Sequence, residues 1–281
     1  MRIDFIADVF AEDVTGGGEL NNEEFINICT SLGHEVRKIN SHLVHVPYIK
    51  NNLNSRFVIA NFINLRKDCK DFLTEHAEYV IYEHDHKYLK NRNPATFHDF
   101  LAPKDMIVNF KFYQKARAIL CQSGFHAGIL EKNLGLINNI NLSGSLWSLN
   151  SIEKMRELSK EKKSDKCSVM NSNTPHKNTN GAVKYCQVKG FEYELIHASE
   201  YFDFLQKLSK NRKLIFFPKT PETLCRLVVE ARMMNVDITT NKLIGAAQEP
   251  WFSLKGEELI EEVLEMRKRI PEKALECFDV Q

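Results

Sequence analysis

The sequence predicts a two-lobe α/β protein in which each lobe contains a parallel β-sheet and a cleft separates the lobes. Three observations predict this fold. Short apolar runs of strand length alternate with amphipathic stretches of helical length, as in βαβ units. The alternation stops in a densely charged segment, residues 151–166, and then begins again. With 281 residues, of which 43% are hydrophobic and 27% charged, the chain is long enough for two globular domains.

The first lobe is predicted over residues 1–150. Gly33 follows an amphipathic stretch and is expected to end its first helix. The predicted strands are Arg2–Val9, Phe57–Asn61, Tyr79–Tyr82 and Ala118–Cys121. The predicted helices cover residues 22–32, 64–75 and 125–133.

The second lobe is predicted over residues 151–255. Residues 151–166 are interpreted as a solvated helix that connects the lobes, with a binding tail as the alternative. The final segment, residues 256–281, is expected to form a long helix that packs back on the first lobe. The expected strands are Cys167–Met170, Phe191–His197, Lys213–Phe217 and Val236–Thr239, and the expected helices are Gly181–Val188, Tyr201–Leu208 and Pro221–Met234.

Charge and cysteine content exclude several classes of protein. The formal net charge of +1 gives no global field that would favour nucleic acid or an acidic membrane. The seven cysteines are scattered without a Cys-x-x-Cys pair, which indicates reduced thiols rather than a disulfide framework or zinc site. The N-terminus does not resemble a signal peptide, and no stretch approaches the roughly 20 apolar residues of a membrane span. We expect a cytoplasmic protein without an integral membrane segment.

Residues 217–231 are the most informative stretch. A strand ends there, Thr220 is placed to cap a helix, and Pro221 is suited to the first helical position. The backbone amides of Glu222, Thr223 and Leu224 are then expected to lie free at the carboxyl edge of the sheet. Such a position suits a phosphate or a sugar hydroxyl.

Two carboxylates occur on this predicted helix. Glu222 and Glu230 are eight residues apart, which is about two turns or ~12 Å along a helix. Carboxylates accept strong hydrogen bonds from hydroxyl groups. We interpret the pair as ligands of the two sugars at either end of a nucleotide diphosphate sugar.

The Glu-x7-Glu pattern resembles the retaining GT-B glycosyltransferases related to glycogen and sucrose synthases, that is, glycosyltransferase family four and its relatives. The resemblance implies a GT-B-like fold of two Rossmann-like lobes. The first lobe then binds the acceptor, and the second binds the nucleotide-sugar donor. It also implies that Glu222 contacts the transferred sugar and acts in catalysis, and that Glu230 binds the donor ribose.

Two further segments agree with the resemblance. Gly16, Gly17 and Gly18 follow the first strand, where the family carries a glycine loop that faces the donor phosphates and the acceptor. A tight βα turn is the alternative explanation. Lys177 lies where the family carries a lysine on the donor diphosphate, and the alternative is a solvated loop lysine.

The sequence also departs from the family pattern. The family usually has glycines after its first glutamate (E-x-F-G), whereas this chain has Thr223, Leu224 and Cys225. The arginine that the family carries five residues before its lysine is replaced by Ser172. The missing phosphate-binding charge is therefore expected from Lys219 or Arg226.

Residues 82–87 follow a buried strand and are expected at the acceptor side. Period-two alternation predicts Glu83 and Asp85 on one face and His84 and His86 on the other. The resemblance implies a histidine near the reacting carbon, so His84 and the adjacent Asp85 are catalytic candidates. A structural strand-end histidine is the alternative. A metal site on His-x-His is less favoured, because the sequence has no other ligand cluster and no Asp-x-Asp motif; we expect no metal.

Residues 87–117 are basic and contain interleaved aromatic residues. Such a surface suits a phosphorylated acceptor or nucleic acid, including a hydroxylated base in phage DNA. The alternative is that the aromatic residues belong to the hydrophobic core.

We therefore predict a retaining hexosyl- or pentosyltransferase that needs no cofactor beyond its nucleotide-sugar substrate and is metal-independent. The acceptor is either a glycan or a modified DNA base. Two alternatives stay open: a sugar-nucleotide epimerase of the same fold, and a catalytically silent subunit that binds a nucleotide sugar. Transfer, epimerisation or inertness toward the donor distinguishes the three.

Overall fold

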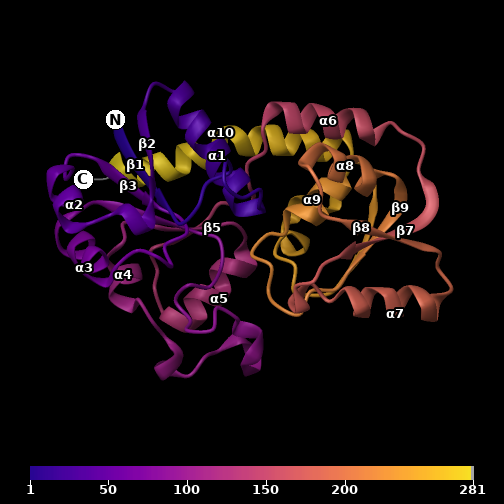
Figure 1. The fold of residues 1–281 in the computed structure, drawn as a ribbon, viewed down its shortest axis with the longest axis horizontal. Coiled ribbons are helices and arrows are strands. Elements are labelled where there is room, and N and C mark those ends of the chain that lie inside the picture. The colour runs from indigo at the N-terminus through magenta and orange to yellow at the C-terminus, as the bar shows by residue number, and fades with distance from the viewer. Residues whose placement is uncertain (280–281) are drawn as a thin grey trace. The chain divides into compact units, whose positions relative to one another are not determined.

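The computed structural model describes residues 1–279 and contains two compact units. Of the described residues, unit 1 contains 1–146 and 266–279, and unit 2 contains 147–265. Each unit has its own parallel sheet with helices packed against it (Figure 1). The predicted two-lobe α/β fold is therefore confirmed.

Unit 1 is built on a six-stranded sheet of order β2-β1-β3-β4-β5-β6, in which every neighbouring pair is parallel. The central strands are apolar because helices cover both faces of a doubly wound sheet. The strands are β1 (Arg2–Ala7), β2 (Glu35–Asn40), β3 (Arg56–Ile59), β4 (Tyr79–Glu83), β5 (Ile119–Cys121) and β6 (Asn139–Asn141). The sequence had indicated β1, β3, β4 and β5, and all four are confirmed.

The helices of unit 1 agree broadly with the predicted ones. They are α1 (Gly17–Ser31), α2 (Val46–Asn51), α3 (Lys67–His76), α4 (Phe110–Lys115) and α5 (Gly124–Leu134), with short 3-10 turns η1 (Ser41–Leu43), η2 (Pro94–Thr96), η3 (His98–Phe100) and η4 (Lys104–Met106). Gly33 has a φ of 84° directly after α1, which confirms it as the helix stop. The predicted start of α1 at residue 22 was wrong. The helix begins at Gly17, with Gly16 as an extended N-cap.

The second half of α10 (Glu257–Asp279) completes unit 1. Arg267 of α10 forms an ion pair with Glu24 of α1. A Cβ at Gly144 would collide with the side chain of Met266 and approach that of Ile270 to 3.4 Å, so a larger residue would displace Met266 from its packing on the 144 loop. Among residues 1–279, no helix combines the length and apolar character needed to cross a bilayer.

Unit 2 has a four-stranded parallel sheet of order β10-β9-β7-β8. Its strands are β7 (Ser164–Asn171), β8 (Tyr193–His197), β9 (Asn211–Phe216) and β10 (Asp237–Thr240). Its helices are α6 (Leu149–Ser159), α7 (Thr179–Lys189), α8 (Tyr201–Ser209), α9 (Arg226–Met233) and the first part of α10, with 3-10 turns η5 (Pro175–Lys177), η6 (Ala246–Gln248) and η7 (Pro250–Ser253). The charged segment 151–166 is only partly helical, because β7 already begins at Ser164.

The helix predicted from Pro221 begins five residues later, at Arg226. Residues 222–224 pair instead with the segment that follows β10. The amide of Glu222 donates to the carbonyl of Leu243 at 2.8 Å, and the carbonyl of Glu222 accepts from the amide of Gly245 at 2.9 Å. The expectation that the Glu222 amide lies free was therefore wrong. The two-turn separation of Glu222 and Glu230 along one helix was wrong for the same reason.

Candidate active site

An ion pair lies where the strands of the unit 2 sheet end. Lys177 is in the loop after β7, and Glu222 is in the loop after β9. The ammonium of Lys177 donates to Oε1 of Glu222 at 2.8 Å and lies 5.8 Å from the ring centroid of Phe216. Burial would lower the pKa of Lys177, but the carboxylate of Glu222 raises it above its ordinary value, so the ammonium stays charged. The structure thus brings together two residues that were predicted to contact the donor.

Two hydrogen bonds hold the two loops against each other. The amide of Lys219 donates to the carbonyl of His176 at 2.8 Å, and the side-chain amide of Asn178 donates to the carbonyl of Phe217 at 2.8 Å. Because both loops follow neighbouring parallel strands, these bonds fix Lys177 and Glu222 at the carboxyl edge where open α/β sheets bind ligands.

A second ion pair lies on α9. Nε of Arg226 is 3.4 Å from Oε1 of Glu230, and the Arg226 guanidinium lies 4.4 Å from the Trp147 ring centroid. The same carboxylate oxygen accepts from Nε1 of Trp147 at 2.9 Å and from the hydroxyl of Tyr201 at 2.8 Å. Glu230 is only 3% exposed. Its charge is therefore balanced by one cation and two neutral donors.

The other residues of unit 2 that were predicted to bind the donor sugar nucleotide differ in their solvent exposure. The side chain of Lys219 is exposed, and that of Thr223 is half-buried. The side chain of Leu224 is buried in the core, and its carbonyl accepts from the amide of Ala246 at 2.9 Å. The side chain of Leu224 is thus part of the core, and the contact predicted for this residue was one of its backbone amide.

Cys225 separates the two ion pairs and has an unusual backbone. It is buried and has φ 77° and ψ 81°, a left-handed conformation that disfavours residues with a Cβ. This position is one of those at which the resembled family carries glycine. The backbone thus adopts the glycine conformation although the residue is cysteine.

This conformation leads to a testable order of stabilities. Relative to Cys225→Ala, we expect Cys225→Gly to be more stable by about 1–2 kcal/mol, because alanine keeps the left-handed strain and glycine removes it. Urea unfolding of both variants measures the difference. The same pair of substitutions at the buried Cys186 within α7, where the backbone is helical, should show the opposite order. Equal stabilities of the two Cys225 variants would contradict the inference that the left-handed backbone at this position is strained.

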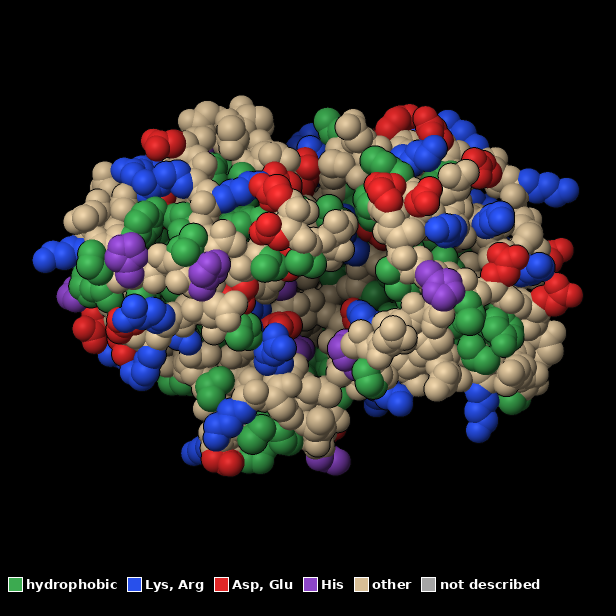
Figure 2. All heavy atoms as spheres, viewed as in Figure 1, with side chains coloured by type: hydrophobic (Ala, Val, Ile, Leu, Met, Phe, Trp, Pro, Cys, Tyr) green, Lys and Arg blue, Asp and Glu red, His purple; other side chains and the backbone are tan. Residues whose placement is uncertain are grey.

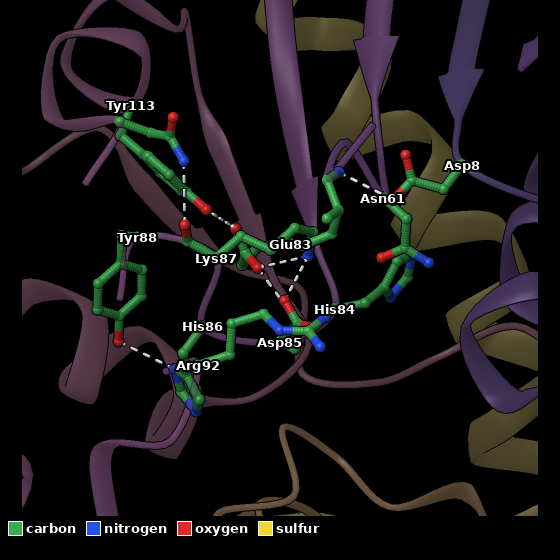
Figure 3. A network of polar contacts seen from close by, with 12 residues as sticks. Asp8, Asn61, Glu83, His84, Asp85, His86, Lys87, Tyr88, Arg92 and Tyr113 are labelled. Atoms are coloured by element: carbon green, nitrogen blue, oxygen red, sulfur yellow. Dashed lines mark hydrogen bonds and ion pairs between the residues drawn. The ribbon is translucent and has the colours of Figure 1, made fainter. Parts of the chain in front are cut away.

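Polar side chains cluster after β4 in unit 1 (Figure 3). Lys87 is almost completely buried and donates to Oε1 of Glu83 at 2.8 Å and to Oδ1 of Asp85 at 2.6 Å. The hydroxyl of Tyr113 donates to the other oxygen of Glu83. Burial raises the pKa of Glu83. Burial acts in the same direction on Asp85, but Lys87 outweighs it and lowers the pKa of Asp85 to about 2.

His84 and Gly18 are brought together at this end of the sheet. The His84 ring stacks on Tyr82 with centroids 4.8 Å apart, and Nε2 lies 2.6 Å from Oδ1 of Asn22. A Cβ on Gly18 would lie 3.5 Å from Cγ of His84. Gly17 and Gly18 belong to the first turn of α1, and neither has a positive φ, so the tight turn considered for these glycines is not what requires them. Asp85 stays partly exposed beside Arg92, at 3.3 Å.

The sequence analysis missed two further residues of this unit, Asp8 and Asn22. Asp8, at the end of β1, accepts from the backbone amides of Ile63 and Asn64 at 2.8 and 2.9 Å and so fixes the loop after β3. Asn22 holds His84. A polar residue after a buried strand is the signal for Asp8, whereas nothing in the sequence marks Asn22 as the partner of a histidine 62 residues away.

A buried histidine pair was also missed. The rings of His86 and His126 are perpendicular, with centroids 5.2 Å apart, and Nδ1 of His86 lies 2.9 Å from the hydroxyl of Tyr88. Within the described chain, Nε2 of His86 and both ring nitrogens of His126 have no hydrogen-bond partner. Burial lowers the pKa of His86 to about 4 and lowers the pKa of His126 well below its ordinary value. Both rings are therefore neutral near pH 7.

This pair predicts the direction of a pH dependence. Since the folded-state pKa values lie below the unfolded value of about 6.5, the stabilisation is complete above pH 6.5 and declines as pH falls toward 4. Each histidine contributes a slope of up to about 1.4 kcal/mol per pH unit to the free energy of unfolding. Denaturant titrations from pH 7 to pH 4.5 measure it. The variant His126→Leu should have a flatter profile, while His98→Asn, at a fully exposed histidine, should not. An unchanged profile of His126→Leu would contradict the assignment.

No family model matches the sequence, and no curated protein is detectably similar to it in sequence. Solved structures are similar in fold across nearly the whole chain. An alpha-glucosyltransferase in complex with UDP and a 13-mer DNA containing an HMU base has a TM-score of 0.53 at 12% identity and covers 99% of this chain and 94% of its own. A glycosyltransferase from Rickettsia africae has a TM-score of 0.54 at 13% identity, with coverage of 98% and 92%. Anabaena HepE in complex with UDP and glucose has a TM-score of 0.51 at 12% identity, with coverage of 98% and 93%. These neighbours are GT-B glycosyltransferases, and this chain has their two-lobe fold.

Proposed function

We propose that this chain is a retaining glycosyltransferase that takes a sugar from a nucleoside diphosphate donor. The observation that carries the proposal is the pair of Lys177 and Glu222 at 2.8 Å on the carboxyl edge of the unit 2 sheet. An ammonium group binds phosphate, and a carboxylate accepts hydrogen bonds from sugar hydroxyls. The fold supports the proposal, since two neighbours of this fold were solved with UDP bound.

The donor contacts follow from the two ion pairs. We assign Lys177 to the diphosphate, Glu222 to the transferred sugar and Glu230 to the ribose. The backbone of Glu222 is already bonded to residues 243 and 245, so its carboxylate rather than its amide is the contacting group. That backbone pairing also limits the freedom of the carboxylate, which helps to position the sugar.

The acceptor contacts are assigned to His84 and Asp85 in unit 1. In the proposed reaction the acceptor oxygen attacks the anomeric carbon as the bond to the diphosphate breaks, on the same face of the sugar. The departing phosphate oxygen takes the proton of the acceptor hydroxyl. No side-chain nucleophile and no metal are required, so stabilisation of the leaving diphosphate supplies most of the rate. Transfer that is unchanged in excess EDTA is the expected result.

A hydroxylated base in DNA and a glycan hydroxyl are the two acceptors to test. Of the basic, aromatic segment 87–117, the side chains of Tyr88, Phe112 and Tyr113 are buried in the core, which weakens the case for base stacking. Lys90 and Lys104 are exposed. On the face drawn in Figure 2, side chains of both signs are intermingled on each unit. DNA remains a candidate because a neighbour of the same fold was solved with it.

A ligand screen tests the proposed donor. We expect one of the UDP-, GDP-, ADP- and TDP-sugars to raise the melting temperature, by about 2–4 °C for each kcal/mol of binding energy in a chain of this size. Each variant is compared with its own ligand-free melting temperature. Lys177→Gln should lose most of the shift, because it removes the ammonium, whereas Lys166→Gln, at a half-exposed ion pair, should keep it.

The products of the same samples distinguish the alternatives. Sugar transfer or donor hydrolysis supports a transferase, an epimerised donor supports an epimerase, and an intact donor supports a silent subunit. No shift with any of the four donor families would overturn the proposed donor site.

A further inference from the structure

The two ion pairs of unit 2 balance each other in charge. Lys177 pairs with Glu222 at 2.8 Å, and Arg226 pairs with Glu230 at 3.4 Å. Two cations and two carboxylates give no net charge. Each cation is therefore already neutralised by a carboxylate when a diphosphate arrives. The diphosphate gains little electrostatic binding energy from these cations unless the carboxylates form hydrogen bonds with other groups.

The two pairs lie close to one residue. Cys225 immediately precedes Arg226 and follows Glu222 by three residues. Burial raises the pKa of its thiol; the charges of Glu222 and Glu230 raise the pKa further, and Lys177 lowers it. Cys225 thus connects the loop that carries Glu222 to the helix that carries Arg226 and Glu230. The left-handed turn at Cys225, with its φ of 77°, is the N-cap of α9 and marks the change from loop to helix.

If Arg226 moves away from Glu230, the carboxylate still accepts two hydrogen bonds. Trp147 and Tyr201 donate to the same Glu230 oxygen at 2.9 and 2.8 Å, both shorter than the contact from Arg226. A buried carboxylate that keeps two donors avoids most of the penalty of an unpaired charge. The guanidinium keeps its contact with the Trp147 ring, which does not depend on Glu230.

We infer that Arg226 is the second diphosphate-binding cation and that donor binding exchanges the partners of both ion pairs. Lys177 and Arg226 turn to the diphosphate, while Glu222 and Glu230 take the hydroxyls of the sugar and the ribose. Arg226 then supplies the charge that Ser172 lacks. This inference rests on the proposed function, because it names how the same site recognises its anionic donor.

The exchange predicts opposite effects on the binding of inorganic pyrophosphate, which carries neither sugar nor ribose. In the full-length chain, we expect Glu222→Gln to bind pyrophosphate about tenfold more tightly than the unaltered protein, because Lys177 loses its counterion. Arg226→Gln should bind about tenfold more weakly, and Arg226→Lys should lie within a few-fold of the unaltered protein. Isothermal titration calorimetry at constant ionic strength measures all three.

A matched pair at the other end of β9 serves as the control. Arg212 and Asp165 form an exposed ion pair at 3.0 Å, and we expect Arg212→Gln and Asp165→Asn to leave pyrophosphate binding unchanged. Circular dichroism checks the fold of Arg226→Gln, since Arg226 packs on Trp147. If Arg226→Gln binds pyrophosphate as the unaltered protein does, or if Glu222→Gln binds it no more tightly, the exchange is overturned.

The same titrations with UDP, GDP, ADP and TDP separate this inference from the proposed function. Binding of one nucleotide without the opposite effects on pyrophosphate overturns the exchange and leaves the donor site standing. The opposite effects on pyrophosphate without binding of any nucleotide support the anion site and count against the glycosyltransferase.

Discussion

Replacing Lys87 by methionine is expected to lower the free energy of unfolding of unit 1 by about 3–5 kcal/mol. The ammonium is buried between Glu83 and Asp85, and its removal leaves two carboxylates facing each other with much of their compensating charge lost. Methionine has nearly the same volume as lysine, so the loss reports the charge rather than a cavity. Chemical denaturation at pH 7 measures it.

Two controls sharpen this prediction. Lys67 forms an exposed ion pair with Asp71 at 2.6 Å, and Lys67→Met should cost less than about 1 kcal/mol. The triple variant Lys87→Met, Glu83→Gln, Asp85→Asn should recover much of the loss, because it removes the uncompensated charges as well. If Lys87→Met is as mild as Lys67→Met, the network does not stabilise the segment that holds His84.

Replacing Glu222 by glutamine is expected to reduce sugar transfer by about 10²–10³-fold while nucleotide binding persists. Glutamine keeps the shape and can still accept a hydrogen bond, but it lacks the charge that strengthens the bond to the sugar as the leaving group departs. The measurement is the single-turnover rate of transfer, or of donor hydrolysis, at saturating donor.

Another carboxylate of unit 2 provides the comparison for this second prediction. Glu194 on β8 forms a half-exposed ion pair with Lys166 at 3.2 Å, and Glu194→Gln should retain full activity. Full turnover of Glu222→Gln with donor binding intact would show that Glu222 has no part in catalysis. A loss of donor binding and of turnover together would instead place its effect in the ground state.

The fold was predictable where strands are buried and less so at the sheet edges. β1, β3, β4 and β5 are apolar runs, and the sequence indicates each of them. β2 consists of Glu35–Asn40, with only two apolar residues, and β6 of Asn139–Asn141, with one. Both are edge strands, which are paired on one side only and tolerate polar residues, so local hydrophobicity does not reveal them.

The contact between Lys177 and Glu222 agrees with the sequence analysis, but the local backbone around Glu222 does not. The resemblance pointed to Lys177 and Glu222, and the structure joins them. The capping pattern of Thr220 and Pro221 nevertheless predicted a helix that does not begin there. Residues 222–224 instead form backbone hydrogen bonds with residues 243–246, and this pairing outweighs the local helix propensity. Because the partner segment is some twenty residues away in the chain, the local sequence does not reveal the pairing.

Buried polar partners were the least predictable part. His126 lies in the first turn of α5, the helix that follows β5, and contacts His86 because β4 and β5 are neighbours in the sheet. Lys87 belongs to segment 87–117, which the sequence analysis interpreted as a basic surface. In the structure Lys87 is buried, and it forms ion pairs with Glu83 and Asp85. Charge counts along the chain cannot distinguish a solvated lysine from one that is neutralised in the interior.

The discontinuity of unit 1 has a consequence for synthesis of the chain. Unit 2 is a single uninterrupted stretch, Trp147–Glu265, whereas unit 1 needs residues from both ends of the polypeptide. The ribosome synthesises the chain from the N-terminal side. Unit 2 can therefore finish folding while unit 1 still lacks Arg267, the partner of Glu24. Although it is made first, unit 1 is the last to be completed. Premature termination near residue 265 therefore damages the domain at the beginning of the chain.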